Sequence, residues 1–120
     1  MNFNHFETSL GKENEYPKLV RDKIPEIIKK EKNVKVKIRI LEDDKEYLEF
    51  LFKKIKEEVD ELVNAKNKDH MVEELSDVME VIDEILKSNN LNLKDIQNAQ
   101  KSKVLERGGF LKRILMLEKK

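Results

Sequence analysis

The stretch EEVDELVNAKNKDHMVEELSD, residues 57–77, sets the expected fold. It holds two similar acidic phrases, Glu58-x-x-Glu61 and Glu74-x-x-Asp77, on either side of the polar segment NAKNKD. Beyond both phrases apolar residues recur every three or four positions, which is the period of an amphipathic helix. The stretch therefore predicts two long helices that run antiparallel across a short turn.

The first long helix is expected over about residues 44–65 and the second over about residues 70–87. Asp43 with Glu46 matches a capping box, and Asp69 is in place to cap the second helix. The apolar residues expected to form the core face of the pair are Leu48, Leu51, Phe52, Ile55, Val59, Leu62 and Val63 on the first helix, and Leu75, Val78, Met79, Ile82, Ile85 and Leu86 on the second.

Shorter elements flank this pair. Pro25 suits the first turn of a short helix, and Asn92 can cap a helix that runs to about Glu106 and ends at RGGF. Residues 34–41, VKVKIRIL, alternate apolar and charged side chains and predict a strand, with which residues 110–117 could form a small β-hairpin. The expected fold class is mainly α, a helix bundle, with residues 1–15 as a polar lead-in and residues 16–120 as a single domain.

Composition excludes several functions. The 120 residues carry 25 basic and 25 acidic side chains, so no net charge draws the chain to a nucleic-acid polymer or to a membrane surface. No apolar run reaches the ~18 residues of a membrane span, and the N-terminus has no apolar run of the kind found in signal peptides. With no cysteine there is no disulfide framework. We expect a cytoplasmic enzyme or binding module.

The acidic phrases are either solvated helix surface or the ligands of one metal site. On a helical projection both phrases lie to the same side of their apolar stripes, at about 80° for the first acid and about 140° for the second. Antiparallel packing of the stripes therefore brings both acidic pairs to one side of the helix pair, at nearly the same axial level.

Charge favours the metal site. Between Asp69 and Leu86 there are seven acids and no Lys or Arg, so neighbouring carboxylates repel one another. A divalent cation would offset this repulsion, and oxygen ligands without cysteine point to Mg²⁺ or Mn²⁺. Val81 lies seven residues beyond Glu74 on the same flank, which suggests that another subunit or a bound base covers it.

Three motifs resemble those of a known family. KLVRDKIPEII at 18–28, EEVDEL followed by EELSDVMEVI, and KVLERGGF at 103–110 occur in the order found in the MazG-like superfamily of nucleotide pyrophosphohydrolases. Within it the sequence is most similar to the branch called phosphoribosyl-ATP pyrophosphohydrolase-like. The resemblance covers about residues 16–118.

The resemblance implies an all-α NTP pyrophosphatase-type bundle, assembled as a homodimer or homotetramer, that uses Mg²⁺ to hydrolyse a nucleoside triphosphate to the monophosphate and pyrophosphate. The metal-binding and catalytic residues implied by position are Glu58, Glu61, Glu74 and Asp77, with Glu57 and Glu80 as outer ligands or bases. The cations in or near the matching motifs that are expected to contact phosphate are Lys18, Arg21, Lys23, Lys103 and Arg107, of which Arg21 and Arg107 are favoured.

Two other functions remain open at this point. One is phosphoribosyl-ATP hydrolysis in histidine biosynthesis, which uses the same cleavage and the same acids. The other is a helical, metal-stabilised interaction module without turnover. His70, at the start of the second long helix, could approach the acidic site, although an exposed helix-start histidine is the more common role.

Overall fold

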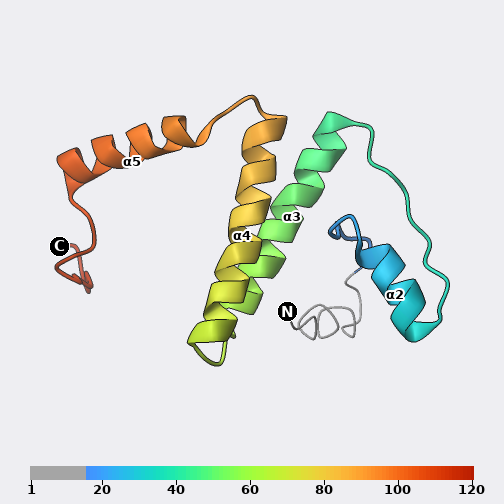
Figure 1. Cartoon of the computed structure of the whole chain (residues 1–120). Helices are drawn as coiled ribbons and strands as arrows, with labels where there is room; N and C mark the ends of the chain where they lie inside the picture. The colour runs from blue at the N-terminus through green and yellow to red at the C-terminus, as the bar shows by residue number, and fades with distance from the viewer. Residues whose placement is uncertain (1–15) are drawn as a thin grey trace. The chain divides into compact units, whose positions relative to one another are not determined.

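A computed structural model describes residues 16–120 of the chain. Within this range the structure is all-α, with α2 (Ile24–Lys32), α3 (Asp44–Val63), α4 (Lys68–Ser88) and α5 (Leu93–Arg107) (Figure 1). The chain divides into two compact units, one that extends to Ile85 and one that starts at Leu86. Each unit is described by itself.

The helices α3 and α4 form the antiparallel pair that the sequence predicts. Tyr47, in the first turn of α3, donates a hydrogen bond of 3.1 Å to Oε2 of Glu84, near the end of α4. Glu58, late in α3, lies beside Glu74, early in α4. A start-to-end contact and an end-to-start contact require opposite helix directions. The helix boundaries agree with the expected ones to within about two residues.

Of the N-terminal caps predicted for α3 and α4, the structure has the first but not the second. The Asp43 side chain accepts a hydrogen bond from the Glu46 amide at 2.9 Å, as predicted for α3. For α4 the cap is Asn67, whose Oδ1 accepts from the His70 amide at 2.8 Å, and the prediction that Asp69 caps this helix is wrong. The helix begins earlier, and Asp69 lies in its first turn, where a negative charge interacts favourably with the helix dipole.

The expected apolar stripes of α3 and α4 are only partly buried. Phe52, Leu75 and Met79 are 49%, 45% and 47% exposed. The buried apolar residues are Leu51 at 3%, Val81 at 7% and Leu86 at 7%, of which Leu51 and Leu86 belong to the expected stripes. Val81 lies two turns beyond Glu74 and therefore on the acidic face of α4. Helical periodicity locates an apolar face but not the neighbour that covers it. The expected stripes are therefore confirmed in part, since most of their residues are buried or half-buried and the others stay exposed.

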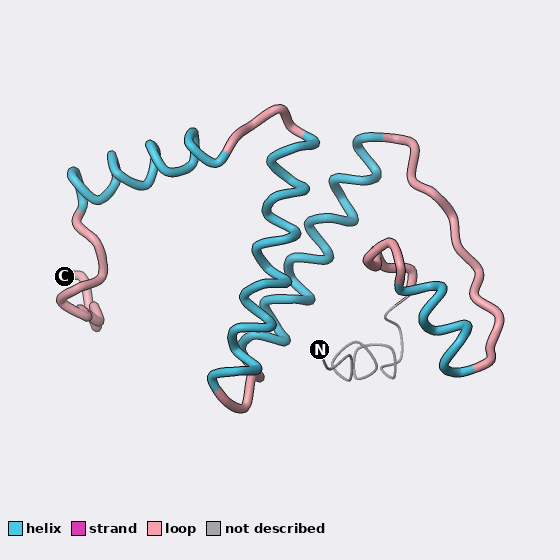
Figure 2. Tube along the Cα trace, viewed as in Figure 1, coloured by secondary structure: helices cyan, strands magenta, loops and turns pink. Residues whose placement is uncertain are grey.

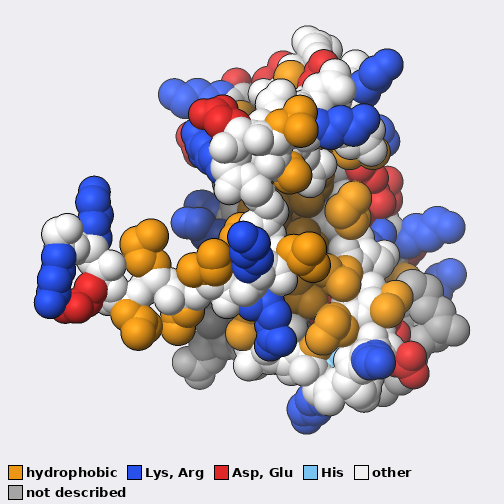
Figure 3. Space-filling model, turned by 90° about the vertical axis from the view of Figure 1, so that its left-hand side faces the viewer, with side chains coloured by type: hydrophobic (Ala, Val, Ile, Leu, Met, Phe, Trp, Pro, Cys, Tyr) orange, Lys and Arg blue, Asp and Glu red, His pale blue; other side chains and the backbone are white. Residues whose placement is uncertain are grey.

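Apolar side chains consequently remain on the surface of the pair. Figure 3 shows apolar side chains exposed among charged ones on the face of the molecule that it draws. The exposed apolar face of the pair consists of Phe52, Val59 and Val63 on α3 and Met71, Val72, Leu75 and Met79 on α4. We call these seven residues the uncovered face.

The predicted strands are absent from residues 16–120 (Figure 2). Residues 34–41 form a connection between α2 and α3, in which Ile38 and Ile40 are 60% and 74% exposed. Residues 112–120 likewise have no regular structure, and Leu117 is 83% exposed. Alternation predicts a strand only where a second strand completes the hydrogen-bond ladder, and the described chain provides none for either segment.

The second unit contains α5, which starts and ends as predicted. Asn92 and Asp95 form a reciprocal capping box at its start. The helix ends at Gly108, whose φ of 84° is in the region that favours glycine. Among residues 16–120, no helix combines the length and apolar character needed to cross a bilayer.

Candidate metal centre

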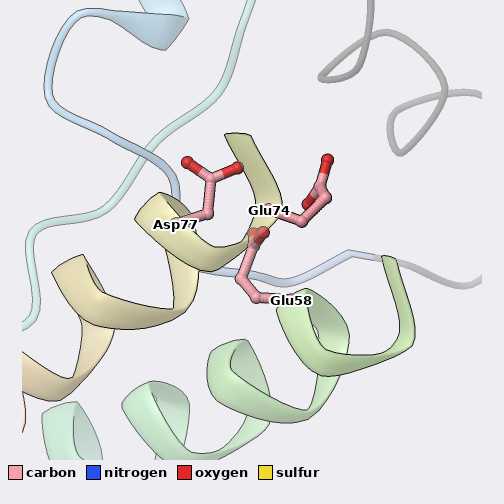
Figure 4. A group of neighbouring side chains, drawn as sticks. All are labelled: Glu58, Glu74 and Asp77. Carbon is pink, nitrogen blue, oxygen red and sulfur yellow. The ribbon is translucent and has the colours of Figure 1, made fainter. Parts of the chain in front are cut away.

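Three carboxylates from two helices meet in the first unit (Figure 4). Glu58 comes from α3, whereas Glu74 and Asp77 come from successive turns of α4. Each offers one oxygen, and these three oxygens lie within 4.8 Å of one another. The antiparallel packing of the ExxE and ExxD phrases therefore brings together three of the four predicted ligands.

The carboxylates are withdrawn from solvent. Glu74 is 0% exposed and Glu58 is 9% exposed, and the Asp77 side chain is 14% exposed. Burial raises the pKa of Glu58 to about 7 against the lowering effect of Lys54, and the carboxylates of Asp77, Glu57 and Glu74 raise it further. Buried carboxylates that repel one another are unfavourable unless positive charge offsets them.

Side-chain cations surround this group. Nη2 of Arg21 lies 2.7 Å from Oδ1 of Asp77, and Nζ of Lys54 lies 3.4 Å from Oε1 of Glu58. Each of these two carboxylates therefore faces a positive charge from outside the acidic phrases.

The third carboxylate faces a histidine. Nε2 of His70 lies 3.3 Å from Oε1 of Glu74. The other ring nitrogen, Nδ1, accepts from the Lys66 amide at 3.3 Å, so in the neutral ring Nε2 carries the hydrogen. The structure therefore places His70 beside the group, as the sequence allowed.

Glu57 belongs to a separate ionic network next to the centre. It accepts hydrogen bonds from Lys18 at 3.1 Å and from Lys54 at 2.7 Å. Burial acts to raise the pKa of Glu57, but the bonds and charges of Lys54 and Lys18 hold this pKa below its ordinary value. Because the carboxylate is paired and held ionised, Glu57 is poorly suited to the role of base.

A groove of about 580 Å³ adjoins this network, between the segment 16–19 and α3. Its walls include the rings of Tyr16 and Phe50, and the lysines that line it are Lys18, Lys53, Lys54 and Lys56. Glu61 also lines the groove and lies outside the group of three carboxylates found among residues 16–120. The ExxE phrase is therefore divided, with Glu58 in the centre and Glu61 at the groove.

The remaining predicted residues lie elsewhere. Lys23 is exposed at the N-terminus of α2, and Glu80 is exposed on α4. Lys103 and Arg107 lie on α5, in the second unit. Lys54 was not singled out from the sequence, although its spacing of three and four residues from Glu57 and Glu58 is that of helical ion pairs.

The donor set fits a small divalent cation. Carboxylate oxygens are the ligands that Mg²⁺ and Mn²⁺ prefer in proteins. In octahedral coordination at about 2.1 Å, adjacent oxygens are about 3.0 Å apart and opposite oxygens about 4.2 Å apart. The three oxygens lie within 4.8 Å of one another, so they must approach each other by as much as about 2 Å to bind one ion. Glu58, Glu74 and Asp77 could therefore hold such an ion once their side chains rotate inward around it.

Comparisons of the chain with models of protein families, with curated proteins and with solved structures found no match.

Proposed function

We propose that this protein is a Mg²⁺-dependent nucleotide pyrophosphohydrolase, which cleaves a nucleoside triphosphate between the α- and β-phosphates. The observation that carries the proposal is the meeting of Glu58, Glu74 and Asp77 within 4.8 Å on an antiparallel helix pair. The resemblance of the three sequence motifs to MazG-like pyrophosphohydrolases supports the same reaction. Mn²⁺ is the alternative cation for this donor set.

The reaction joins a water oxygen to a phosphorus of the α–β bridge, breaks the bridging P–O bond and releases pyrophosphate. A divalent cation, when bound, supplies positive charge that neutralises phosphate oxygens. The part of Glu58, Glu74 and Asp77 is to hold that charge in a fixed place, away from bulk water, where it acts most strongly.

The proton of the attacking water needs an acceptor. Glu61 follows Glu58 by one helical turn and lines the groove, and the group of three donors does not include it. We assign it the role of general base, which requires reach to the water rather than to the cation. This assignment replaces the ligand role that the resemblance implies for Glu61.

Cations of the chain balance the charge of the substrate. Arg21 and Lys54 already lie at the centre, and Lys18 and Lys53 line the groove next to it. A triphosphate that reaches the centre through this groove would meet positive charge along its path. Lys23, Lys103 and Arg107 stay candidates for phosphate contact from the sequence motifs.

Assembly is part of the proposal. The uncovered face carries seven apolar side chains, each at least 41% exposed, and an exposed apolar face of this kind is typical of a protein interface. We infer a homodimer or homotetramer in which a second copy covers this face.

The test is a pyrophosphate-release assay with a panel of nucleoside triphosphates and phosphoribosyl-ATP, each with Mg²⁺ and with EDTA. The proposal predicts release that depends on Mg²⁺ with at least one nucleotide. Release from phosphoribosyl-ATP alone would assign the protein to histidine biosynthesis. Binding of Mg²⁺ without turnover of any substrate would favour the interaction module.

A further inference from the structure

Arg21 reaches the metal centre from outside the helix pair. It lies in the segment before α2, and its Nη2 contacts Oδ1 of Asp77 at 2.7 Å. The two partners differ in burial, because the Arg21 side chain is 54% exposed and the Asp77 side chain is 14% exposed. An exposed guanidinium thus closes over one carboxylate of a buried group.

Lys54 offers a contrast on the other helix. Its side chain is 17% exposed and is held by a hydrogen bond of 2.7 Å to Glu57 as well as by its contact with Glu58. Lys54 is therefore anchored whether or not a divalent cation binds to Glu58. Among the described residues, Arg21 has its side-chain hydrogen bond with Asp77. Arg21 would therefore lose one contact on moving away, whereas Lys54 would lose its contacts with both Glu57 and Glu58.

A guanidinium and a divalent cation compete for the same carboxylate. Two positive charges on one small group repel each other, and the repulsion is strongest where water is excluded. Binding of the cation at Asp77 therefore weakens the hold on Arg21. Once released, a guanidinium is suited to a phosphate group, to which it donates two parallel hydrogen bonds.

We propose that Arg21 is an exchangeable latch, which holds Asp77 while the centre lacks a divalent cation and moves to a phosphate of the nucleotide once the cation has displaced it. This inference rests on the proposed function and adds an order of binding to it. The cation binds first, and its arrival makes Arg21 available for the anionic substrate.

The latch predicts effects of opposite sign in Arg21→Ala. The variant should bind Mg²⁺ about two- to fivefold more tightly, because a partly exposed competing ion pair is gone. It should bind inorganic pyrophosphate, in the presence of Mg²⁺, about tenfold more weakly or worse, because a charge-assisted hydrogen-bond donor is gone. A structural tether would move both affinities in the same direction.

The experiment is calorimetric titration of the full chain with Mg²⁺, and then with pyrophosphate at saturating Mg²⁺. The matched control is Arg39→Ala, which removes the same charge from an exposed arginine that is bound to Glu46 at 2.9 Å. Both affinities of this control should equal those of the wild type. Melting curves of all three proteins show whether each is folded.

Three results would overturn the latch. If the wild type binds Mg²⁺ and Arg21→Ala binds it equally or more weakly, Arg21 does not compete, while the metal centre itself stands. If Arg21→Ala binds pyrophosphate as tightly as the wild type does, Arg21 does not move to a phosphate group. Absence of Mg²⁺ binding in all three proteins would overturn both the latch and the proposed function.

Discussion

The two faces of the α3–α4 pair reverse the usual distribution of side chains. On one face Glu74 and Glu58 are 0% and 9% exposed. On the other, Leu75 and Met79 are 45% and 47% exposed, although Leu75 directly follows Glu74 in the chain. Burial of carboxylates and exposure of apolar side chains are both unfavourable. The proposed function supplies a partner for each face, a cation for the acids and a second chain for the uncovered face.

The largest expected effect concerns the acidic face. Glu58→Gln and Asp77→Asn should each lower the rate of pyrophosphate release about 100-fold or more, because each loses a charge that holds the cation at the scissile phosphate. Without metal the Glu58→Gln protein should melt at an equal or higher temperature, since a buried charge is removed. The measurement is the release assay beside a melting curve.

The control for these two variants is Glu49→Gln, which changes an exposed acid on the same helix as Glu58. This control protein should keep its activity. Full activity in both Glu58→Gln and Asp77→Asn would return these acids to the class of ordinary helix carboxylates. Glu61→Gln tests whether Glu61 acts as a general base or as a metal ligand. If Glu61 is the base, this variant should lose turnover and still bind Mg²⁺.

The pH dependence of stability is the next effect in size. The pKa of Glu58 is raised from 4.5 to about 7, so between these values the folded state binds more protons than the unfolded state. Without metal, the contribution of Glu58 to the free energy of unfolding is therefore most favourable below about pH 4.5. It falls by about 2–3 kcal/mol as the pH rises through about 7. Urea denaturation in EDTA at several pH values measures this slope.

Two variations sharpen the pH experiment. Glu58→Gln should flatten the dependence, because the group that changes its proton affinity on folding is gone. Mg²⁺ should also reduce it by stabilising the ionised centre. A wild-type stability that rises between pH 5 and 7 would show that this carboxylate is not destabilising when it is ionised.

The uncovered face supplies a third effect. Leu75→Glu with Met79→Glu should weaken self-association about tenfold or more, because two charges would be buried in the proposed interface. Light scattering over a range of concentrations measures the assembly. The exposed pair Lys35→Glu with Lys37→Glu, outside this face, is the control. A wild type that stays monomeric at micromolar concentration would contradict the account of this face.

The smallest effect is expected at the end of the α3–α4 pair that is distant from the three carboxylates, where Glu84 accepts a hydrogen bond from the neutral side chain of Tyr47. Tyr47→Phe removes the hydrogen bond to Glu84 and should lower the free energy of unfolding by about 1 kcal/mol. Activity should not change, because this contact is near the start of α3 rather than at the centre. A large loss of activity would mean that the two ends of the pair are coupled.

The sequence predicted what depends on local pattern. The period of the apolar residues located α3 and α4. The acidic phrases at equal distances from the turn predicted that Glu58, Glu61, Glu74 and Asp77 would meet, and all of these except Glu61 do. The caps at Asp43 and Asn92 were predicted because cap chemistry is local.

What depends on distant partners could not be predicted in the same way. The pattern of Leu75 and Met79 marks an apolar face but does not say that α3 leaves it exposed. Residues 34–41 alternate as a strand does, yet no second strand is present among residues 16–120 to pair with them. The contact of Arg21 with Asp77 joins residues 56 positions apart, which no local spacing reveals.

Anomalous scattering from crystals grown with Mn²⁺ would show whether Glu58, Glu74 and Asp77 hold a divalent cation. Binding of Mn²⁺ by this group predicts one anomalous peak at bonding distance from an oxygen of each of these three residues. It also predicts that Arg21 will have moved away from Asp77. Crystals at millimolar Mn²⁺ with no peak at this place, and with Arg21 and Lys54 still paired to the acids, would contradict it.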